Sequence, residues 1–137
     1  MKNKSQAKTK VPQKNGVYAF LAYWKMLADK KLPQPVQEYQ FAKAQGRKWA
    51  FDLAWPDKVV VLRPGRVNQY LPKGRVAVEI EGGLYIQGGH RRGAAYERNL
   101  AKYNAAVGMG WHLLRFSPGM LERNPPNCIS QVEALLK

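Results

Sequence analysis

The amino-acid sequence predicts a single α/β domain that follows a short basic arm. The 137 residues, 45% of them hydrophobic, suffice for one domain with a real core. Along the chain, segments whose apolar residues recur every second position, as in strands, alternate with segments whose apolar residues have helical spacing. We therefore expect a disordered basic arm over residues 1–15 and one domain over residues 16–137.

The net charge of +14 at pH 7 is unusual for so short a chain. It indicates a polyanionic partner, either nucleic acid or an anionic membrane surface, although it can also serve only to keep a surface solvated. The sequence has no apolar run of about 18 residues and no basic amphipathic helix, so we expect DNA as the partner and no membrane. A single cysteine, Cys128, excludes an internal disulfide and fits the cytoplasm, near the nucleoid or, for a phage protein, in the host.

Three helices are predicted from apolar residues at helical spacing, over residues 17–29, 94–107 and 127–137. Each is expected to bury its apolar stripe in the core. In the second helix the residues of that stripe are Tyr96, Leu100, Tyr103 and Val107. Residues 1–15 hold lysines and almost nothing apolar, so the arm either keeps the chain in solution or contacts phosphate.

A β-hairpin is predicted over residues 38–55, with its turn at residues 44–46. Large apolar residues occupy the odd positions of both arms, and polar or small residues occupy the even ones. If the turn centres on Gln45, Glu38 lies directly opposite Asp52, with their Cβ atoms about 5 Å apart. The hairpin then holds two carboxylates within reach of one metal ion, and a shift of register by one residue would separate them.

The strand predicted over residues 76–81 carries two further acids on one face. Its branched apolar side chains point to the opposite face, so Glu79 and Glu81 lie together. Gly82 and Gly83 follow, where the backbone can turn sharply and approach a ligand closely. A core strand does not usually give one face to acids unless a cation lies there.

Four of the nine acidic residues therefore fall on predicted strands: Glu38, Asp52, Glu79 and Glu81. Neighbouring strands are about 4.8 Å apart, so these acids converge if the hairpin lies beside the strand over residues 76–81. A bound Mg²⁺ or Mn²⁺ would offset their repulsion, activate a water molecule and polarise a phosphoryl oxygen. The alternative is a set of surface salt bridges to the many lysines and arginines.

Basic residues on two loops are candidates for contact with the phosphate chain. They are Arg63, Arg66 and Lys73 within residues 58–74, and His90, Arg91 and Arg92 within residues 84–93. The first loop either faces DNA or is only solvated. The second follows the acidic strand directly, which suits a clamp on the scissile strand; His90 either assists proton transfer there or takes no part.

Several stretches, in this order, resemble the PD-(D/E)XK nuclease superfamily, and in particular its small branch that includes the very-short-patch-repair endonucleases. They are residues 49–56, residues 78–83, His90, residues 102–104 and residues 110–116. The resemblance, over roughly residues 17–120, implies a restriction-endonuclease-like α/β fold: a mixed central β-sheet flanked by α-helices, with a Mg²⁺-dependent nuclease site at the strand ends. Asp52 matches the motif aspartate and Glu79 the motif acid, and both are implied to be metal ligands.

Two departures from the family pattern set further expectations. Glu81 fills the position of the motif lysine, and Lys102 on the following helix either replaces that lysine or is simply solvated. The first helix has no glutamate, so Glu38 is expected to supply the extra carboxylate. The expected catalytic residues are thus Asp52, Glu79, Glu81 and Lys102, and the expected metal ligands are Asp52, Glu79 and Glu38.

The function expected from these features is a metal-dependent DNA endonuclease in DNA repair, recombination or phage DNA processing. The class includes structure-selective nickases and Holliday junction resolvases, and a resolvase is expected to be a homodimer. The alternative is a non-catalytic nucleic-acid-binding protein that retains the nuclease fold. A third, weaker reading is an RNA-processing nuclease, since no aromatic base-stacking signature separates RNA from DNA.

Overall fold

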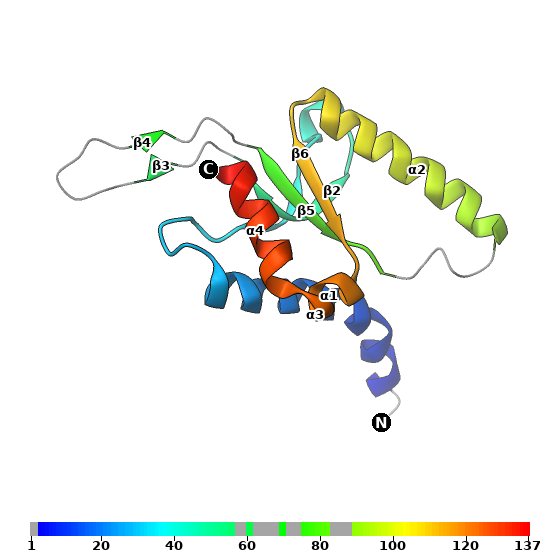
Figure 1. The fold of residues 1–137 in the computed structure, drawn as a ribbon. Coiled ribbons are helices and arrows are strands. Elements are labelled where there is room, and N and C mark those ends of the chain that lie inside the picture. Colours follow the sequence, from blue (N-terminus) through cyan, green and yellow to red (C-terminus); the bar gives the residue numbers. More distant parts are fainter. Residues whose placement is uncertain (1–2, 57–59, 62–68, 71–74, 83–88) are drawn as a thin grey trace.

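A four-stranded mixed sheet with helices on both faces forms the centre of the molecule (Figure 1). The computed structural model describes the backbone of residues 3–56, 60–61, 69–70, 75–82 and 89–137, and the side chains of residues 15–56, 75–82 and 93–137. The elements in chain order are α1 (Asn3–Leu27), β1 (Val36–Gln40), the 3-10 turn η1 (Lys43–Gln45), β2 (Ala50–Trp55), β3 (Val60–Val61), β4 (Gln69–Tyr70), β5 (Val76–Ile80), α2 (Gly89–Gly108), β6 (His112–Phe116), α3 (Pro118–Arg123) and α4 (Pro125–Leu136).

The strand order of the sheet is β1-β2-β5-β6, and β3 and β4 pair as a separate two-stranded ribbon. β1, β2 and β5 are antiparallel neighbours, whereas β6 runs parallel to β5. A parallel pair needs a crossover connection, and α2 supplies it. The expected α/β fold class with a mixed sheet between helices is therefore confirmed at this level. None of the described helices is both long and apolar enough to span a membrane.

The β1–β2 hairpin has the register that the sequence predicts. Gln37 lies opposite Leu53 and Tyr39 opposite Phe51, which places Glu38 opposite Asp52. The turn between the arms ends at Gly46, whose φ of 78° is left-handed and therefore suits glycine. The register keeps the two carboxylates of the hairpin on neighbouring strands at the same height.

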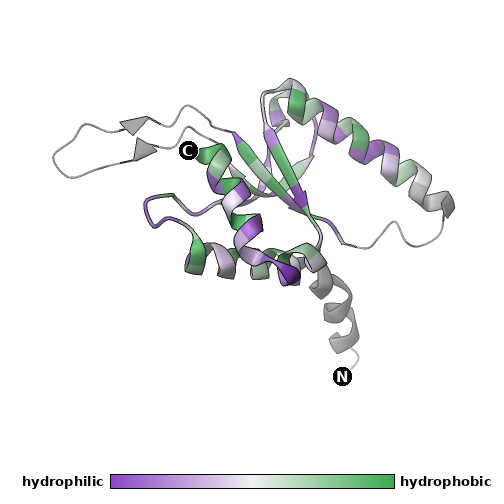
Figure 2. Ribbon diagram, in the orientation of Figure 1, coloured by the Kyte–Doolittle hydropathy of each residue, from purple (hydrophilic) through white to green (hydrophobic). Residues whose placement is uncertain are grey.

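Each face of the sheet has its own apolar cluster. On one face Phe20 and Trp24 of α1 pack with Val78 and Ile80 of β5, and residues of α3 and α4 complete this cluster. On the other face the buried Ala106 of α2 belongs to a smaller cluster with residues of β2 and β5. Hydrophobic residues concentrate in the central strands, while α2 mixes hydrophobic and hydrophilic residues along its length (Figure 2).

The rotation of α2 differs from the prediction. Its expected stripe is largely exposed, at 57%, 41% and 66% for Tyr96, Leu100 and Val107. Only the C-terminal half of the helix lies against the sheet, and it turns Lys102 and the small Ala106 inward. The predicted stripe was wrong because the pairing of Lys102 with a buried carboxylate, together with the small side chain of Ala106, sets which side of the helix faces the sheet.

Two helices begin earlier than the sequence pattern predicts. α1 begins at Asn3 and not at residue 17, so the backbone from Asn3 onward is helical where a disordered arm was expected. Lysine, glutamine and alanine all have good helix propensity, which lets the packed helix continue toward the N-terminus without an apolar stripe. α2 begins at Gly89 and not at residue 94. A phosphate-contacting role for residues 1–15 stays a prediction.

The first prediction concerns Gly16, where α1 crosses β5. A Cβ atom at this position would lie 2.6 Å from Ile80 Cγ2, well inside van der Waals contact. Gly16→Ala should therefore lower the free energy of unfolding by about 1–3 kcal/mol, because helix or strand must shift. Urea denaturation measures the change. The matched control is Gly93→Ala in α2, where nothing lies within 4 Å and a gain of about 0.5–1 kcal/mol is expected. A Gly16→Ala protein as stable as the parent would contradict the close crossing.

Candidate active site

Asp52 and Glu79 face each other where β2 and β5 separate. The backbone ladder between these strands runs from Trp55 and Val76 to Leu53 and Val78. At the next position the side chains take over: the Asp52 N–H donates to Glu79 Oε2 at 2.9 Å, and the Ile80 N–H donates to Asp52 Oδ2 at 2.8 Å. Each carboxylate is thus fixed by a backbone amide of the opposite strand. The two acids lie together, as the sequence predicts.

Lys102 reaches this acid pair from α2. Its Nζ lies 3.1 Å from Glu79 Oε1, and the two side chains are only 13% and 11% exposed. The ammonium group also lies 5.9 Å from the centre of the Phe51 ring and 5.8 Å from that of Tyr103. The reading of Lys102 as a solvated lysine is therefore wrong. Its role as the replacement for the motif lysine stays a prediction.

Burial dominates the electrostatics of both carboxyl groups. It raises the pKa of Asp52 above its ordinary value, although the Ile80 N–H and Lys102 oppose the shift. It likewise raises the pKa of Glu79, against the opposing effect of Lys102. The charge of Asp52 also raises the pKa of Glu79, and the charges of Glu38 and Glu81 raise the pKa of Asp52. One ammonium group does not fully compensate two buried carboxylates, so further positive charge would be favourable here.

The donor set fits a hard divalent cation. Mg²⁺ is typically held by one or two carboxylates, and waters and substrate phosphates complete its octahedral shell. Asp52 and Glu79 supply two such groups. In the part of the chain that the structure describes, no three Asp, Glu, His or Cys side chains are gathered closely enough to hold one ion. Glu38, although opposite Asp52, is thus not brought into a three-ligand group with Asp52 and Glu79.

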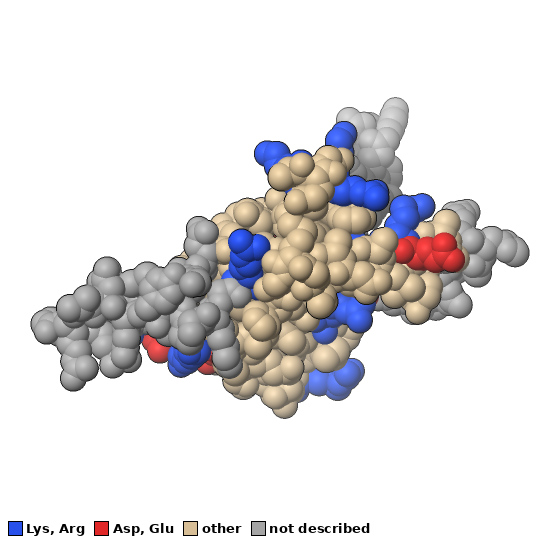
Figure 3. All heavy atoms as spheres, turned by 90° about the horizontal axis from the view of Figure 1, so that it is seen from above, with Lys and Arg blue, Asp and Glu red and all other residues tan. Residues whose placement is uncertain are grey.

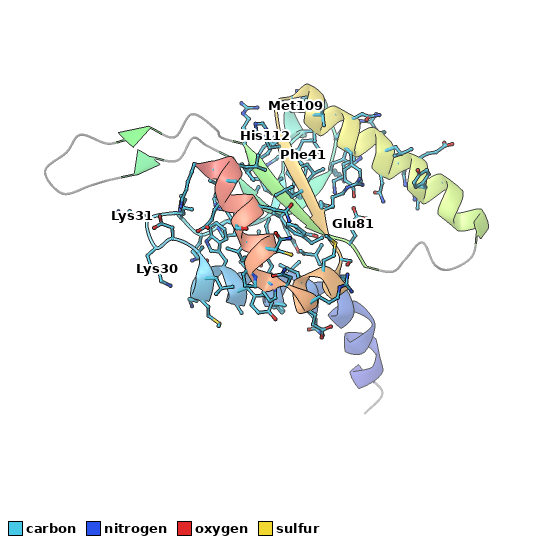
Figure 4. All side chains as sticks on the ribbon, in the orientation of Figure 1. Lys30, Lys31, Phe41, Glu81, Met109 and His112 are labelled. Carbon is cyan, nitrogen blue, oxygen red and sulfur yellow. The ribbon has the colours of Figure 1, made fainter. Side chains whose placement is uncertain are left out.

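Glu81 turns toward a different set of partners. The Tyr103 hydroxyl donates to Glu81 Oε2 at 2.7 Å, and Arg115 Nη1 lies 3.6 Å from the same oxygen. Figure 4 shows Glu81 beyond the end of β5, on the side that faces α2. The catalytic role expected for Glu81 stays a prediction, but the structure occupies this carboxylate with residues of α2 and β6.

Sequence reasoning gave no role to Tyr103 or Arg115. Tyr103 was assigned to a buried apolar stripe, and Arg115 was only part of a matching stretch. The signal that identifies Arg115 is its register: it lies beside Glu79 in the parallel β5–β6 pair. That pairing depends on which strands become neighbours, and a single sequence does not state it.

The basic residues expected to contact nucleic acid lie outside the residues whose side chains are described. They are Arg63, Arg66, Lys73, His90, Arg91 and Arg92, and their role stays a prediction. On the described surface, the turn that precedes β2 carries the exposed cations Lys43, Arg47 and Lys48. Figure 3 shows Lys and Arg side chains spread over one face of the molecule, with few acidic groups in view.

No protein-family model, no curated protein and no solved structure matches this chain. Its function is therefore inferred from the chemistry of the site.

The second prediction follows from the raised pKa of Asp52. The native state keeps this carboxyl protonated at pH values where the unfolded chain has already released the proton, so ionisation of Asp52 lowers stability as the pH rises above about 4. In EDTA, Asp52→Asn should therefore become more stable than the parent between pH 4 and pH 7, because the amide oxygen still accepts from the Ile80 N–H. Thermal unfolding over this pH range measures the difference.

Asp29→Asn is the control with the opposite sign. The Lys31 N–H, above all, holds the pKa of Asp29 below its ordinary value. This carboxylate therefore contributes stability at neutral pH that is lost as the pH falls, and its variant should be less stable than the parent at pH 7. An Asp52→Asn protein that is less stable than the parent at pH 7 in EDTA would contradict a costly buried charge.

Proposed function

We propose that this chain is a metal-dependent DNA endonuclease with a restriction-endonuclease-like fold, acting in DNA repair, recombination or phage DNA processing. The observation that supports it most is the meeting of Asp52, Glu79 and Lys102, brought together from β2, β5 and α2. Two carboxylates and a lysine that are largely removed from solvent are costly to assemble for packing alone. They fit the binding of a cation and the hydrolysis of a phosphodiester.

Each residue has a separate role in this proposal. Asp52 and Glu79 would hold Mg²⁺ or Mn²⁺, which when bound lowers the pKa of a water molecule and polarises a phosphoryl oxygen. The amide groups of Asp52 and Ile80 fix the orientation of the carboxylates before any ligand arrives. Lys102 directs its ammonium protons toward the attacking water or a non-bridging phosphate oxygen. Hydrolysis then forms the bond from water oxygen to phosphorus and breaks the phosphorus–oxygen bond to one sugar.

The charge distribution supports a nucleic-acid substrate. The net charge of +14 favours binding of a phosphate chain. Lys43, Arg47 and Lys48 are exposed on the turn that leads into β2, the strand that bears Asp52, and they offer phosphate contacts. Binding through such contacts weakens steeply as the salt concentration rises.

A non-catalytic nucleic-acid-binding protein is the second candidate. It is favoured by Glu81, which occupies the position of the motif lysine, and by the missing third acid beside Asp52 and Glu79 within the described residues. Against it stand the acids themselves, because uncompensated carboxylates oppose the binding of a polyanion. The placement of Lys102 also favours catalysis.

The third prediction separates these two functions. The protein is incubated with supercoiled, linear, single-stranded and branched DNA in Mg²⁺, Mn²⁺ or EDTA. We expect nicking or cleavage that requires the metal and that Asp52→Asn and Glu79→Gln lose, while both variants still bind DNA. Lys102→Ala should lower the cleavage rate roughly 100-fold or more, because it removes the group that orients the water.

The matched control is Lys31→Ala. Lys31 lies in the exposed turn after α1, remote from Glu81 (Figure 4), and its removal takes away the same single charge. Cleavage by this variant should stay close to that of the parent protein. Equal cleavage in EDTA would exclude the metal mechanism, and DNA binding without any cleavage would leave the non-catalytic function.

A further inference from the structure

A second polar cluster lies directly beside the acid pair and has no part in the roles given above. Glu81, Tyr103 and Arg115 come from three elements, namely the end of β5, α2 and β6. The Tyr103 hydroxyl donates to Glu81 at 2.7 Å, and the Arg115 guanidinium lies over the Tyr103 ring with its Cζ 4.5 Å from the ring centre. The Tyr103 ring thus positions the guanidinium, and Glu81 in turn holds the Tyr103 hydroxyl.

The Arg115 guanidinium can donate hydrogen bonds to a further ligand. Its Nη1 is 3.6 Å from Glu81 Oε2, a distance for charge attraction and longer than a hydrogen bond. Arginine has five N–H donors in a planar fork, and the Tyr103 side chain and one carboxylate oxygen do not use them all. The Arg115 side chain is 50% exposed, so a ligand can reach it from solvent.

The cluster is the immediate neighbour of the acid pair in the sheet. Arg115 lies beside Glu79 in the parallel β5–β6 pair, about 4.8 Å away along the hydrogen-bonding direction of the sheet. Both Arg115 and Glu81 contact Tyr103 of α2, the helix that also brings Lys102 to Glu79. A phosphate chain with one phosphate at the acid pair therefore has its neighbouring phosphate close to Arg115.

We propose that Arg115 binds the DNA phosphate next to the scissile one, with Glu81 and Tyr103 as the positioning residues that hold its guanidinium. This inference rests on the proposed nuclease function and assigns Glu81 to Arg115, not to the metal. The planar fork of arginine matches two phosphate oxygens, and stacking on an aromatic ring restricts its motion before the ligand binds.

The state of Tyr103 suits this arrangement. Burial, and then the hydrogen bond to Glu81, raise the pKa of the Tyr103 hydroxyl, so it stays protonated and remains a donor to Glu81. The tyrosine thus takes up one site of the Glu81 carboxylate. The negative charge of Glu81 attracts Arg115, but the two side chains do not form a tight bidentate pair. A phosphate can therefore bind Arg115 without first breaking such a pair.

The fourth prediction tests Arg115 by DNA binding in EDTA, which requires neither metal nor cleavage. A fluorescein-labelled duplex is titrated with the full chain at several salt concentrations. Arg115→Gln should weaken binding about tenfold at low salt and reduce the slope of log K against log salt by about 0.9, since one phosphate contact is lost. Arg115→Lys should restore the slope. In Mg²⁺ it should still cleave more slowly than the parent, because a lysine cannot form the bidentate contact.

Arg123→Gln is the matched control. Arg123 is an exposed residue of α3, on the opposite face of the sheet from α2, and its loss removes the same charge. Its variant should keep the slope of the parent. An Arg115→Gln protein indistinguishable from Arg123→Gln overturns the inference.

Glu81 is tested by metal binding. Mn²⁺ titration followed by calorimetry should give the same affinity for Glu81→Gln as for the parent, and a large loss for Glu79→Gln. A loss of Mn²⁺ affinity in Glu81→Gln equal to that in Glu79→Gln would make Glu81 a metal ligand and overturn its assignment to Arg115.

The two proposals fail in different ways. If the parent cleaves DNA and Arg115→Gln behaves as Arg123→Gln does, the phosphate contact is wrong and the nuclease function stands. If binding depends on Arg115 but no DNA is cleaved in Mg²⁺ or Mn²⁺, the contact stands as part of a binding protein and the nuclease function is wrong. A parent protein that binds no DNA overturns both.

Discussion

The reciprocal hold of Asp52 and Glu79 between β2 and β5 is the constraint on which the rest of the site depends. Each carboxylate accepts from the backbone of the other strand, so neither side chain can leave without exposing a buried amide. The two strands separate at this point, and the gap is bridged by acids in place of backbone groups. A functional group positioned by strand backbones in this way is held more rigidly than one on a loop.

Helices on both faces of the sheet pack against β5, the strand that bears Glu79. α1 crosses β5 so closely at Gly16 that only glycine fits against Ile80. On the other face, the apolar stripe of α2 is largely exposed, and the helix places Lys102 next to Glu79. The close crossing at Gly16 and the exposed apolar residues of α2 both lower the stability of the fold, and both are features of helices that contact β5. Such a pattern is expected where function and stability compete for the same residues.

Much of the site could be predicted from the sequence, because strand periodicity fixes which side chains share a face. The alternation along the strand put Glu79 on the face opposite Val78 and Ile80, and a turn centred on Gln45 gave the correct register for Glu38 and Asp52. Lys102 was a candidate only through its place in a motif, and its contact with Glu79 requires α2 to lie over β5. The local sequence pattern shows which side chains of one strand share a face, but it does not show which helix lies over which strand.

The features that the sequence did not predict also depend on which elements become neighbours or lack a periodic pattern. The exposed Tyr96 has the spacing of a core residue, but an ion pair at the other side of the helix decides the rotation of α2. Arg115 meets Glu81 only because β6 pairs with β5 in parallel, which joins residues distant in the chain. The start of α1 at Asn3 was missed because a lysine-rich helix with no apolar stripe has no periodic signal.

The measurement that tests the account most directly is the binding of Mn²⁺ to the protein without DNA, followed by electron paramagnetic resonance at pH 7. The buried carboxylates predict that the parent protein binds Mn²⁺ and that Asp52→Asn, with its fold intact by circular dichroism, loses most of this affinity. Binding that is absent from the parent, or unchanged in the variant, would contradict a cation site built from Asp52 and Glu79.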